Sequence, residues 1–126
     1  MKDNASFKDF QKLDIRVGTV IKVENPDWSH WVTKLTVDLG EEIGERTIFA
    51  GIMHFYKPEE IEGKQYPFVV NLESRKMGPK GDESQGMLLA ATGKPEKKLM
   101  IEGEEVEERP YLFEITENVP NGSKVR

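Results

Sequence analysis

The chain has 126 residues, 37% of them hydrophobic, a formal net charge of −5 and no cysteine. This length supports one hydrophobic core but not two, so we expect a single domain over 1–126. The lack of cysteine excludes disulfides, thiolate catalysis and cysteine-type zinc sites, and the two histidines have no paired spacing; we therefore expect no metal and no other cofactor. No apolar run approaches the about 20 residues of a membrane span, and the N-terminus lacks a secretory signal, so we expect a cytoplasmic protein away from the membrane.

The N-terminal segment predicts a helix followed by a strand. Residues 5–12 fit a short helix that Ser6 caps, with two phenylalanines on one face. Residues 15–23 alternate apolar and polar side chains, with Ile21 on the apolar face, which is typical of a half-buried strand. A Pro-Asp turn at 25–27 ends it.

The next segment predicts two strands and a second helix. Residues 31–39 alternate with Trp31 in phase with the apolar face, so we expect Trp31 in the core and Trp28, next to the turn, in solvent. Residues 46–50 form a third strand. A proline, two acids and a closing glycine predict a single short helix within 56–63.

The remaining sequence predicts further strands separated by charged loops. Strands are expected at 67–72, 87–92 and 111–116, with a loop at 73–85 between the first two. Residues 94–110 are highly charged and fit either an acidic hairpin or a loose insertion. Five strands with one helix between the third and fourth match the OB-fold, a five-stranded Greek-key barrel, here all-β with short helices and a C-terminal strand extension. A generic small β-sandwich is the alternative.

The net charge is concentrated in one stretch. Residues 102–108 contain five glutamates and no base, so this stretch accounts for the whole net charge and the rest of the chain is balanced. Residues 63–80 contain four cations against Glu73 alone. The chain is therefore polarised into an acidic tip and a basic loop, and the alternatives are two ordinary solvated loops or two binding surfaces.

No catalytic constellation is visible, so we expect that the protein is not an enzyme. Ser84 has no histidine near it in sequence and no nucleophile elbow around it. The adjacent carboxylates Glu59 and Glu60 point apart on a helix, unlike an acid/base pair. The glycines at 78–81 lack the spacing of a phosphate-binding loop.

The basic loop and the strand after it carry groups suited to binding RNA. Arginine and lysine suit phosphate oxygens, and amide, hydroxyl and thioether groups can contact sugar and base surfaces. A bend at Gly86 would bring Ser84 and Met87 together, which strict strand alternation would separate. The alternative is that Met87 is core and Ser84 caps a turn. The candidate residues are Asn71, Arg75, Lys76, Lys80, Ser84, Gln85 and Met87.

Several blocks of sequence, in the same order, resemble the tRNA-binding domain family. They cover about 8–92 and 111–126 and are Asp9–Gly18, Ala50–Ile52, Phe55–Lys64, Val70–Leu72, Ser74–Lys76, Glu83–Ala90 and Val119–Val125. The family includes free-standing tRNA-binding proteins, the C-terminal domain of many methionyl-tRNA synthetases, EMAP-II-like domains and CsaA-type export chaperones. The resemblance implies an OB-fold, non-catalytic and structure-dependent tRNA binding, and a homodimer. It also implies that the candidate residues above line the tRNA groove.

One motif differs from the family pattern. Where relatives carry Pro-Asp-Ala-Asp-Lys, this chain has Pro26-Asp27-Trp28-Ser29-His30-Trp31, with His30 or the later Lys34 as imperfect substitutes for the missing lysine. The spacing is similar to that of the chaperone branch, which makes Trp28, His30 and Trp31 candidates for contact with a partner or peptide. The alternatives are therefore a peptide-binding export chaperone, or a subunit that delivers tRNA to a methionyl-tRNA synthetase.

Overall fold

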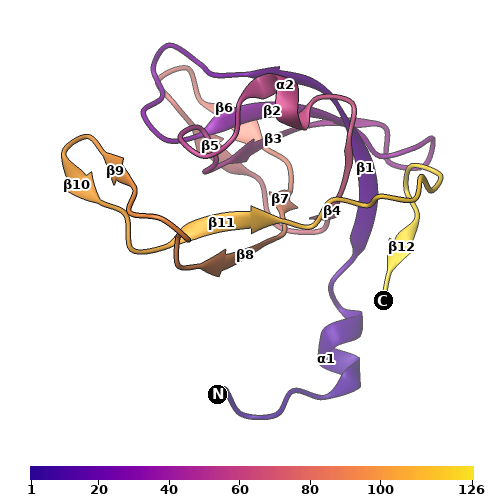
Figure 1. Cartoon of the computed structure of the whole chain (residues 1–126). Helices are drawn as coiled ribbons and strands as arrows, with labels where there is room; N and C mark the ends of the chain where they lie inside the picture. The colour runs from indigo at the N-terminus through magenta and orange to yellow at the C-terminus, as the bar shows by residue number, and fades with distance from the viewer.

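The computed structural model describes all 126 residues (Figure 1). Its elements are, in chain order, α1 (Phe7–Gln11), β1 (Ile15–Glu24), β2 (Thr33–Asp38), β3 (Glu45–Ala50), α2 (Pro58–Ile61), β4 (Gln65–Val69), β5 (Arg75–Met77), β6 (Asp82–Ser84), β7 (Met87–Leu88), β8 (Ala90–Gly93), β9 (Met100–Ile101), β10 (Glu104–Glu105), β11 (Arg109–Leu112) and β12 (Lys124–Val125).

Five antiparallel strands form the body of the molecule in the order β3-β2-β1-β4-β7. The sheet curls until its two edges meet, where the backbone N–H of Gln85, two residues before β7, donates to the carbonyl of Thr47 on β3 at 2.8 Å. The result is a nearly closed barrel of the OB type, with α2 between β3 and β4 as the strand order predicts. The alternative of a β-sandwich is wrong.

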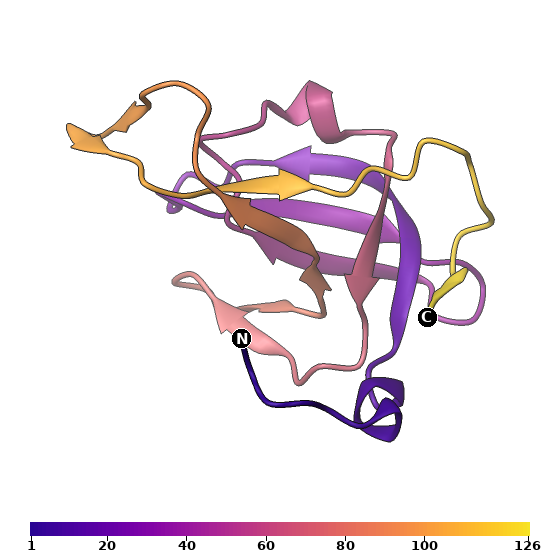
Figure 2. The same cartoon turned by 60° about the horizontal axis from the view of Figure 1, so that its bottom comes forward.

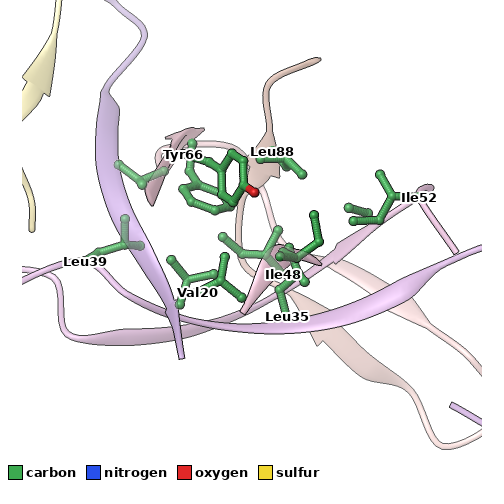
Figure 3. Close-up of a cluster of buried hydrophobic side chains, with 12 residues drawn as sticks. Val20, Leu35, Leu39, Ile48, Ile52, Tyr66 and Leu88 are labelled. Atoms are coloured by element: carbon green, nitrogen blue, oxygen red, sulfur yellow. The ribbon is translucent and has the colours of Figure 1, made fainter. Parts of the chain in front are cut away.

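Aliphatic and aromatic side chains from every barrel strand fill the interior (Figure 3). Phe68, Leu35 and Ile48 are fully buried, and α2 adds Ile61 as a cover. Tyr66 of β4 is 2% exposed, and its burial raises the pKa of the phenol to about 12.

A β-bulge in β1 corrects one part of the predicted pattern. The register with β2 shifts between Val20 and Lys22, so Val20 turns into the core with no exposed surface and Ile21 turns out to 43% exposure. An alternating pattern cannot show where an extra residue enters a strand, because the bulge itself resets which face each residue occupies.

Buried Arg16 fixes the C-terminal segment against the barrel. Its guanidinium bonds to Asp14 at 2.6 Å, to Glu42 at 2.9 Å and to the carbonyl of Gly122 at 3.2 Å. The hydrogen bond that Arg16 donates to the carboxylate of Asp14 raises the pKa of Arg16 further above its ordinary value, so the residue is a permanent internal cation. Strand β12 then pairs with the start of β1, and this is the predicted C-terminal strand extension.

Three small two-stranded sheets lie outside the barrel, and they change the predicted strand limits. The predicted loop at 73–85 contains the hairpin β5–β6, and the predicted strand 87–92 is split at Leu89 so that β8 leaves the barrel to pair with β11. Strand β4 starts two residues before its predicted start. Pro67 is tolerated there because its carbonyl accepts from the N–H of Leu89, so its missing donor faces β7 and not the ladder with β1.

The predicted acidic insertion is a hairpin. Strands β9 and β10 are joined by Glu102 and Gly103, which have φ of 50° and 83°, as a tight two-residue hairpin turn requires. At the open end of the hairpin, the backbone N–H of Val106 donates to the carbonyl of Leu99 at 2.8 Å.

The N-terminal helix lies apart from the core. Ser6 caps it as predicted, accepting from the N–H of Asp9 at 3.0 Å, yet the helix buries none of its residues. Phe7 is 72% exposed, and Phe10 and Leu13 are also in solvent. No helix of the structure is long and apolar enough to cross a membrane, and no three His, Cys, Asp or Glu side chains lie close enough to hold a metal ion.

Candidate nucleic-acid interface

The predicted basic loop is the hairpin β5–β6, which we call the basic hairpin (75–84). Its register places Arg75 opposite Ser84, Lys76 opposite Glu83 and Met77 opposite Asp82. Gly78 and Gly81 have φ of 72° and 70°, so the turn that presents Lys80 depends on both glycines. Figure 2 shows this hairpin and α2 on opposite sides of the barrel.

The three cations of the basic hairpin are available to a ligand but do not share one face. Arg75, Lys76 and Lys80 are exposed, and none of them takes part in an ion pair. Because side chains alternate along a strand, Arg75 shares a face with its partner Ser84, while Lys76 lies on the other face. Only Arg75 therefore faces the barrel side of the hairpin.

A pocket of about 500 Å³ lies between the basic hairpin and the barrel. Its lining residues are Phe49, Leu72, Glu73, Ser74, Arg75, Ser84, Gly86 and Met87. Strand β6 ends at Ser84, Gly86 has φ of 155°, and β7 begins at Met87, so the predicted bend brings Ser84 and Met87 to one pocket. A side chain at Gly86 would meet the carbonyl of Val69 at 2.9 Å, which explains the glycine.

Ser84 and Met87 hold different positions in this pocket. The hydroxyl of Ser84 is buried, accepts from the N–H of Phe49 at 3.0 Å and donates to the carbonyl of Gly86 at 3.2 Å. Both partners are backbone groups, so Ser84 ties the hairpin to β3. Met87 is 45% exposed, so the alternative that it belongs to the core is wrong.

Gln85 and Asn71 use their side chains within the protein. The Oε1 of Gln85 accepts from the N–H of Thr47 at 3.0 Å, which closes the barrel. The Oδ1 of Asn71 accepts from the N–H of Asp14 at 2.7 Å, and its Nδ2 donates to the carbonyl of Lys12 at 2.6 Å. Asn71 therefore joins β4 to the N-terminal segment. It lies in a different pocket from Arg75 and Ser84, contrary to its expected place beside the basic loop.

Lys34 lies beside this site on β2, where its register partner is Phe49. Paired residues of neighbouring strands share a face, so the Lys34 side chain is on the same side of the sheet as Phe49 and the pocket. Lys34 forms no ion pair, although Glu24 is its partner on β1.

The two tryptophans occupy the reverse of their expected positions. Trp28 is half-buried, packs on Phe49 with ring centroids 5.9 Å apart, and touches the basic hairpin at Gly78, where an added Cβ would be 2.6 Å from the indole. Trp31 is 48% exposed and packs on His54 and Phe55. The alternating pattern gave a wrong prediction for Trp31 because β2 begins only at Thr33, so the alternation does not extend back to Trp31.

His30 is exposed in the same loop, and its carbonyl accepts a hydrogen bond from the Nε2 of His54 at 2.6 Å. Together with Trp31, it forms the part of the 25–32 loop that is open to a partner. Trp28 lies between β3 and the basic hairpin and supports the hairpin from beneath.

The glutamates of the insertion do not line the pocket of Arg75. They line a separate pocket with Trp31, whose members are Trp31, Ile101, Glu102, Glu104, Glu105, Val106, Glu107 and Glu108. The Trp28–Trp31 loop contacts both regions, so acidic and basic surfaces are on either side of it.

Sequence reasoning missed two residues of the site. Phe49 lines the pocket and is its apolar floor, and Arg46 donates to the carbonyls of Val70 at 2.5 Å and Gln85 at 3.2 Å, which holds the two ends of the hairpin segment together. A strand with consecutive apolar residues gave no signal that Phe49 faces outward under Trp28.

Comparison with known proteins identifies the family of the chain. The family model described as "Putative tRNA binding domain" matches residues 15–124. The chain belongs to this tRNA-binding domain family. It is 38% identical to a "Methionine--tRNA ligase" from Clostridium tetani over 125 residues, or 99% of the chain and 17% of that protein, so it spans about a sixth of this relative's length.

Solved structures show the same fold at full length. A "MetRS related protein" from Pyrococcus horikoshii is 38% identical, with a TM-score of 0.79 over 99% of this chain and 100% of that one. A chaperone CsaA from Bacillus anthracis is 28% identical, with a TM-score of 0.76 over 98% of this chain and 100% of that one.

Proposed function

We propose that the protein is a non-catalytic tRNA-binding protein that acts as a homodimer and uses the basic hairpin as its main contact. The observation that carries the proposal is the exposed guanidinium of Arg75, free of any internal carboxylate, at a pocket with Ser84, Phe49 and Met87. A guanidinium can engage phosphate oxygens in a bidentate way, while the thioether and the ring offer surface for sugar and base.

The mechanism is electrostatic capture followed by recognition of shape. Lys76 and Lys80 lie on the far face and at the tip of the hairpin, so they suit neighbouring phosphates and not the pocket itself. If about three phosphates are neutralised per barrel, affinity should fall steeply with salt. Base identity has little influence, because the groups that meet the bases are a thioether and a ring.

The test is a gel-shift titration with bulk tRNA at two ionic strengths. Arg75→Glu should weaken binding at least about tenfold and reduce the salt slope by one or more units, roughly one for each lost phosphate contact. Lys57→Glu is the control, because Lys57 is exposed and unpaired beside α2, on the opposite side of the barrel. Equal titration curves for wild type and Arg75→Glu would contradict the proposal.

The N-terminal helix supports the homodimer. Phe7, Phe10 and Leu13 are exposed, and an open pocket joins the helix to β12 and Asn71. A five-residue helix with no buried residue is not stable by itself, so its apolar face needs a partner surface. A second copy would cover it and set two barrels side by side, which would give one folded RNA a longer groove.

Sedimentation of the free protein tests the dimer. Phe7→Asp with Phe10→Asp should give a monomer that still folds, because both side chains lie outside the core. The monomer should bind tRNA more weakly through lost avidity. A monomeric wild type at concentrations that bind tRNA would exclude the homodimer and leave the RNA contact untouched.

The similarity to a CsaA chaperone, together with half-exposed Trp31, keeps peptide binding as the second candidate function. Apolar, unfolded segments would bind at high salt, where RNA binding fades. A peptide panel measured at high salt therefore separates the two functions. The relatives that are methionine–tRNA ligases support the third possibility, delivery of tRNA to a synthetase, which co-purification with such an enzyme would test.

A further inference from the structure

A second surface, separate from the basic hairpin, is formed by Trp31 and the hairpin β9–β10. We call it the acidic groove (Trp31 and 101–108). Its volume is about 400 Å³, and it combines the indole with half-buried Ile101 and Val106 and five exposed glutamates. None of the five carboxylates forms an ion pair within the chain.

The indole is a fixed wall of this groove. Trp31 packs on Phe55 with ring centroids 5.8 Å apart and planes at 84°, and the ring of His54 lies 5.3 Å away. Gly51 lies beneath, where an added Cβ would be 2.9 Å from the indole nitrogen. About half of the side chain nevertheless remains open, so a rigid aromatic surface faces the glutamates.

The same aromatic cluster already holds one cation of the chain. The guanidinium of Arg109 lies over the rings of Phe55, Tyr56 and Tyr111, with distances to the centroids of 5.9, 5.4 and 4.4 Å. Phe55 thus contacts both the guanidinium of Arg109 and the indole of Trp31. Trp31 is the ring of this cluster that is left without a cation, and indole is the side chain that binds cations best.

From this arrangement we propose that the acidic groove is a docking surface for a basic, extended segment of a partner protein, with an arginine or lysine on Trp31 and further cations on the glutamates. Charge complementarity decides the class of partner. Five unpaired carboxylates repel RNA phosphates, whereas they attract guanidinium and ammonium groups and steer them to the groove. Ile101 and Val106 favour a polypeptide with an aliphatic stem or small apolar side chain over a free metal or polyamine.

The proposal goes beyond tRNA binding and is independent of it. The acidic groove shares no lining residue with the pocket of Arg75. A partner docked on the acidic groove and an RNA on the basic hairpin can therefore bind one molecule at the same time, on either side of the 25–32 loop.

The experiment titrates the full chain with a short peptide of alternating arginine and alanine, and with peptides in which glutamine or leucine replaces arginine. The chain has two tryptophans, so a nitrogen–proton spectrum shows two indole signals, and Trp31→Phe assigns them. The arginine peptide should bind with a dissociation constant below about 100 μM at low salt and shift the Trp31 signal more than that of Trp28. The glutamine and leucine peptides should not.

Variants test the two halves of the groove separately. Trp31→Ala and the pair Glu104→Gln with Glu105→Gln should each weaken the arginine peptide at least about fivefold and leave tRNA binding unchanged. The matched control is Glu59→Gln with Glu62→Gln, two exposed and unpaired glutamates of the α2 region. The glutamates of the groove are on the surface, so their variants fold even if Trp31→Ala does not.

Three results would overturn the proposal: no binding of the arginine peptide, equal loss in the groove and control variants, or a Trp31 signal that does not move. Oligomers of the wild type that dissociate in Trp31→Ala would also overturn it, in favour of a second copy as the occupant. Failure of the wild type to bind tRNA would instead contradict the function proposed above and would not affect the proposal for the acidic groove.

Discussion

The two charged hairpins of this protein are the same kind of element with opposite charge and different anchoring. The basic hairpin is joined to the barrel by Ser84, Gln85 and Trp28, through the hydrogen bonds to β3 and the packing at Gly78. The acidic hairpin β9–β10 is closed by a backbone hydrogen bond between Val106 and Leu99, and its glutamates line an open groove with Trp31. We infer that the basic hairpin holds its cations in a fixed geometry, while the acidic hairpin has few contacts with the barrel and holds its glutamates less rigidly.

Replacing each tryptophan by alanine tests this difference in anchoring and has the largest expected effect. Trp28→Ala should lower the free energy of unfolding by about 3 kcal/mol, because it removes a half-buried ring from between Phe49 and the basic hairpin. Trp31→Ala should cost about 1 kcal/mol or less, since half of the ring is already in solvent. Urea unfolding followed by circular dichroism measures both. Equal losses would show that the two hairpins are anchored alike.

Charge reversal tests the difference in function. Arg75→Glu with Lys80→Glu should weaken tRNA binding about thirtyfold, or about 2 kcal/mol, because two phosphate contacts become repulsions. Glu104→Lys with Glu105→Lys should strengthen it by less than about threefold, through long-range attraction alone. Gel shifts at one salt concentration suffice. If the lysine substitutions at Glu104 and Glu105 raised tRNA affinity as much as the first pair lowers it, RNA would have to contact both hairpins.

Ser84→Ala tests the link between the basic hairpin and β3. The substitution leaves the N–H of Phe49 buried without an acceptor, so we expect a loss of about 1–2 kcal/mol of unfolding free energy. No side chain of β9 or β10 donates or accepts a comparable hydrogen bond to the barrel, and Glu107→Ala, two residues after β10, should be neutral. A neutral Ser84→Ala in the same urea experiment would show that another group replaces the hydroxyl.

The barrel beneath both hairpins should lose stability at alkaline pH through Tyr66. Its folded pKa of about 12 lies above the unfolded value of 10.0, so its contribution is complete below pH 10 and is lost as the pH rises toward 12. Thermal unfolding should reveal a falling melting temperature across that range, less steep in Tyr66→Phe. The same slope in both proteins would assign the alkaline loss to other groups.

The smallest expected effect concerns the turn of the acidic hairpin. Glu102 adopts a φ of 50°, which asparagine tolerates better, so Glu102→Asn should stabilise the hairpin by roughly 0.5 kcal/mol. Hydrogen exchange at Val106, whose N–H bond closes the hairpin, measures the gain locally. Faster exchange in the variant would contradict the turn geometry.

The sequence predicted the barrel well but only part of the site. The alternation of apolar and polar residues predicted β2 and most of β1, and Pro58 with the closing Gly63 predicted α2. These predictions succeeded because each pattern involves residues that are neighbours in sequence. Asn71 was misplaced since its partners, Lys12 and Asp14, are more than fifty residues away. Composition alone could not show that Arg75 and Lys76 face opposite ways, because the loop 73–85 was not recognised as a hairpin.

Local patterns in the sequence are sufficient to predict the strand order, the family, and the separation of cations and glutamates into two stretches. Three features follow from the fold alone: which tryptophan is buried, which cation faces the pocket, and that the glutamates lie with Trp31 and not with Arg75. These features depend on register, on a bulge in β1 and on contacts across the barrel. Each of them joins residues that no sequence period connects.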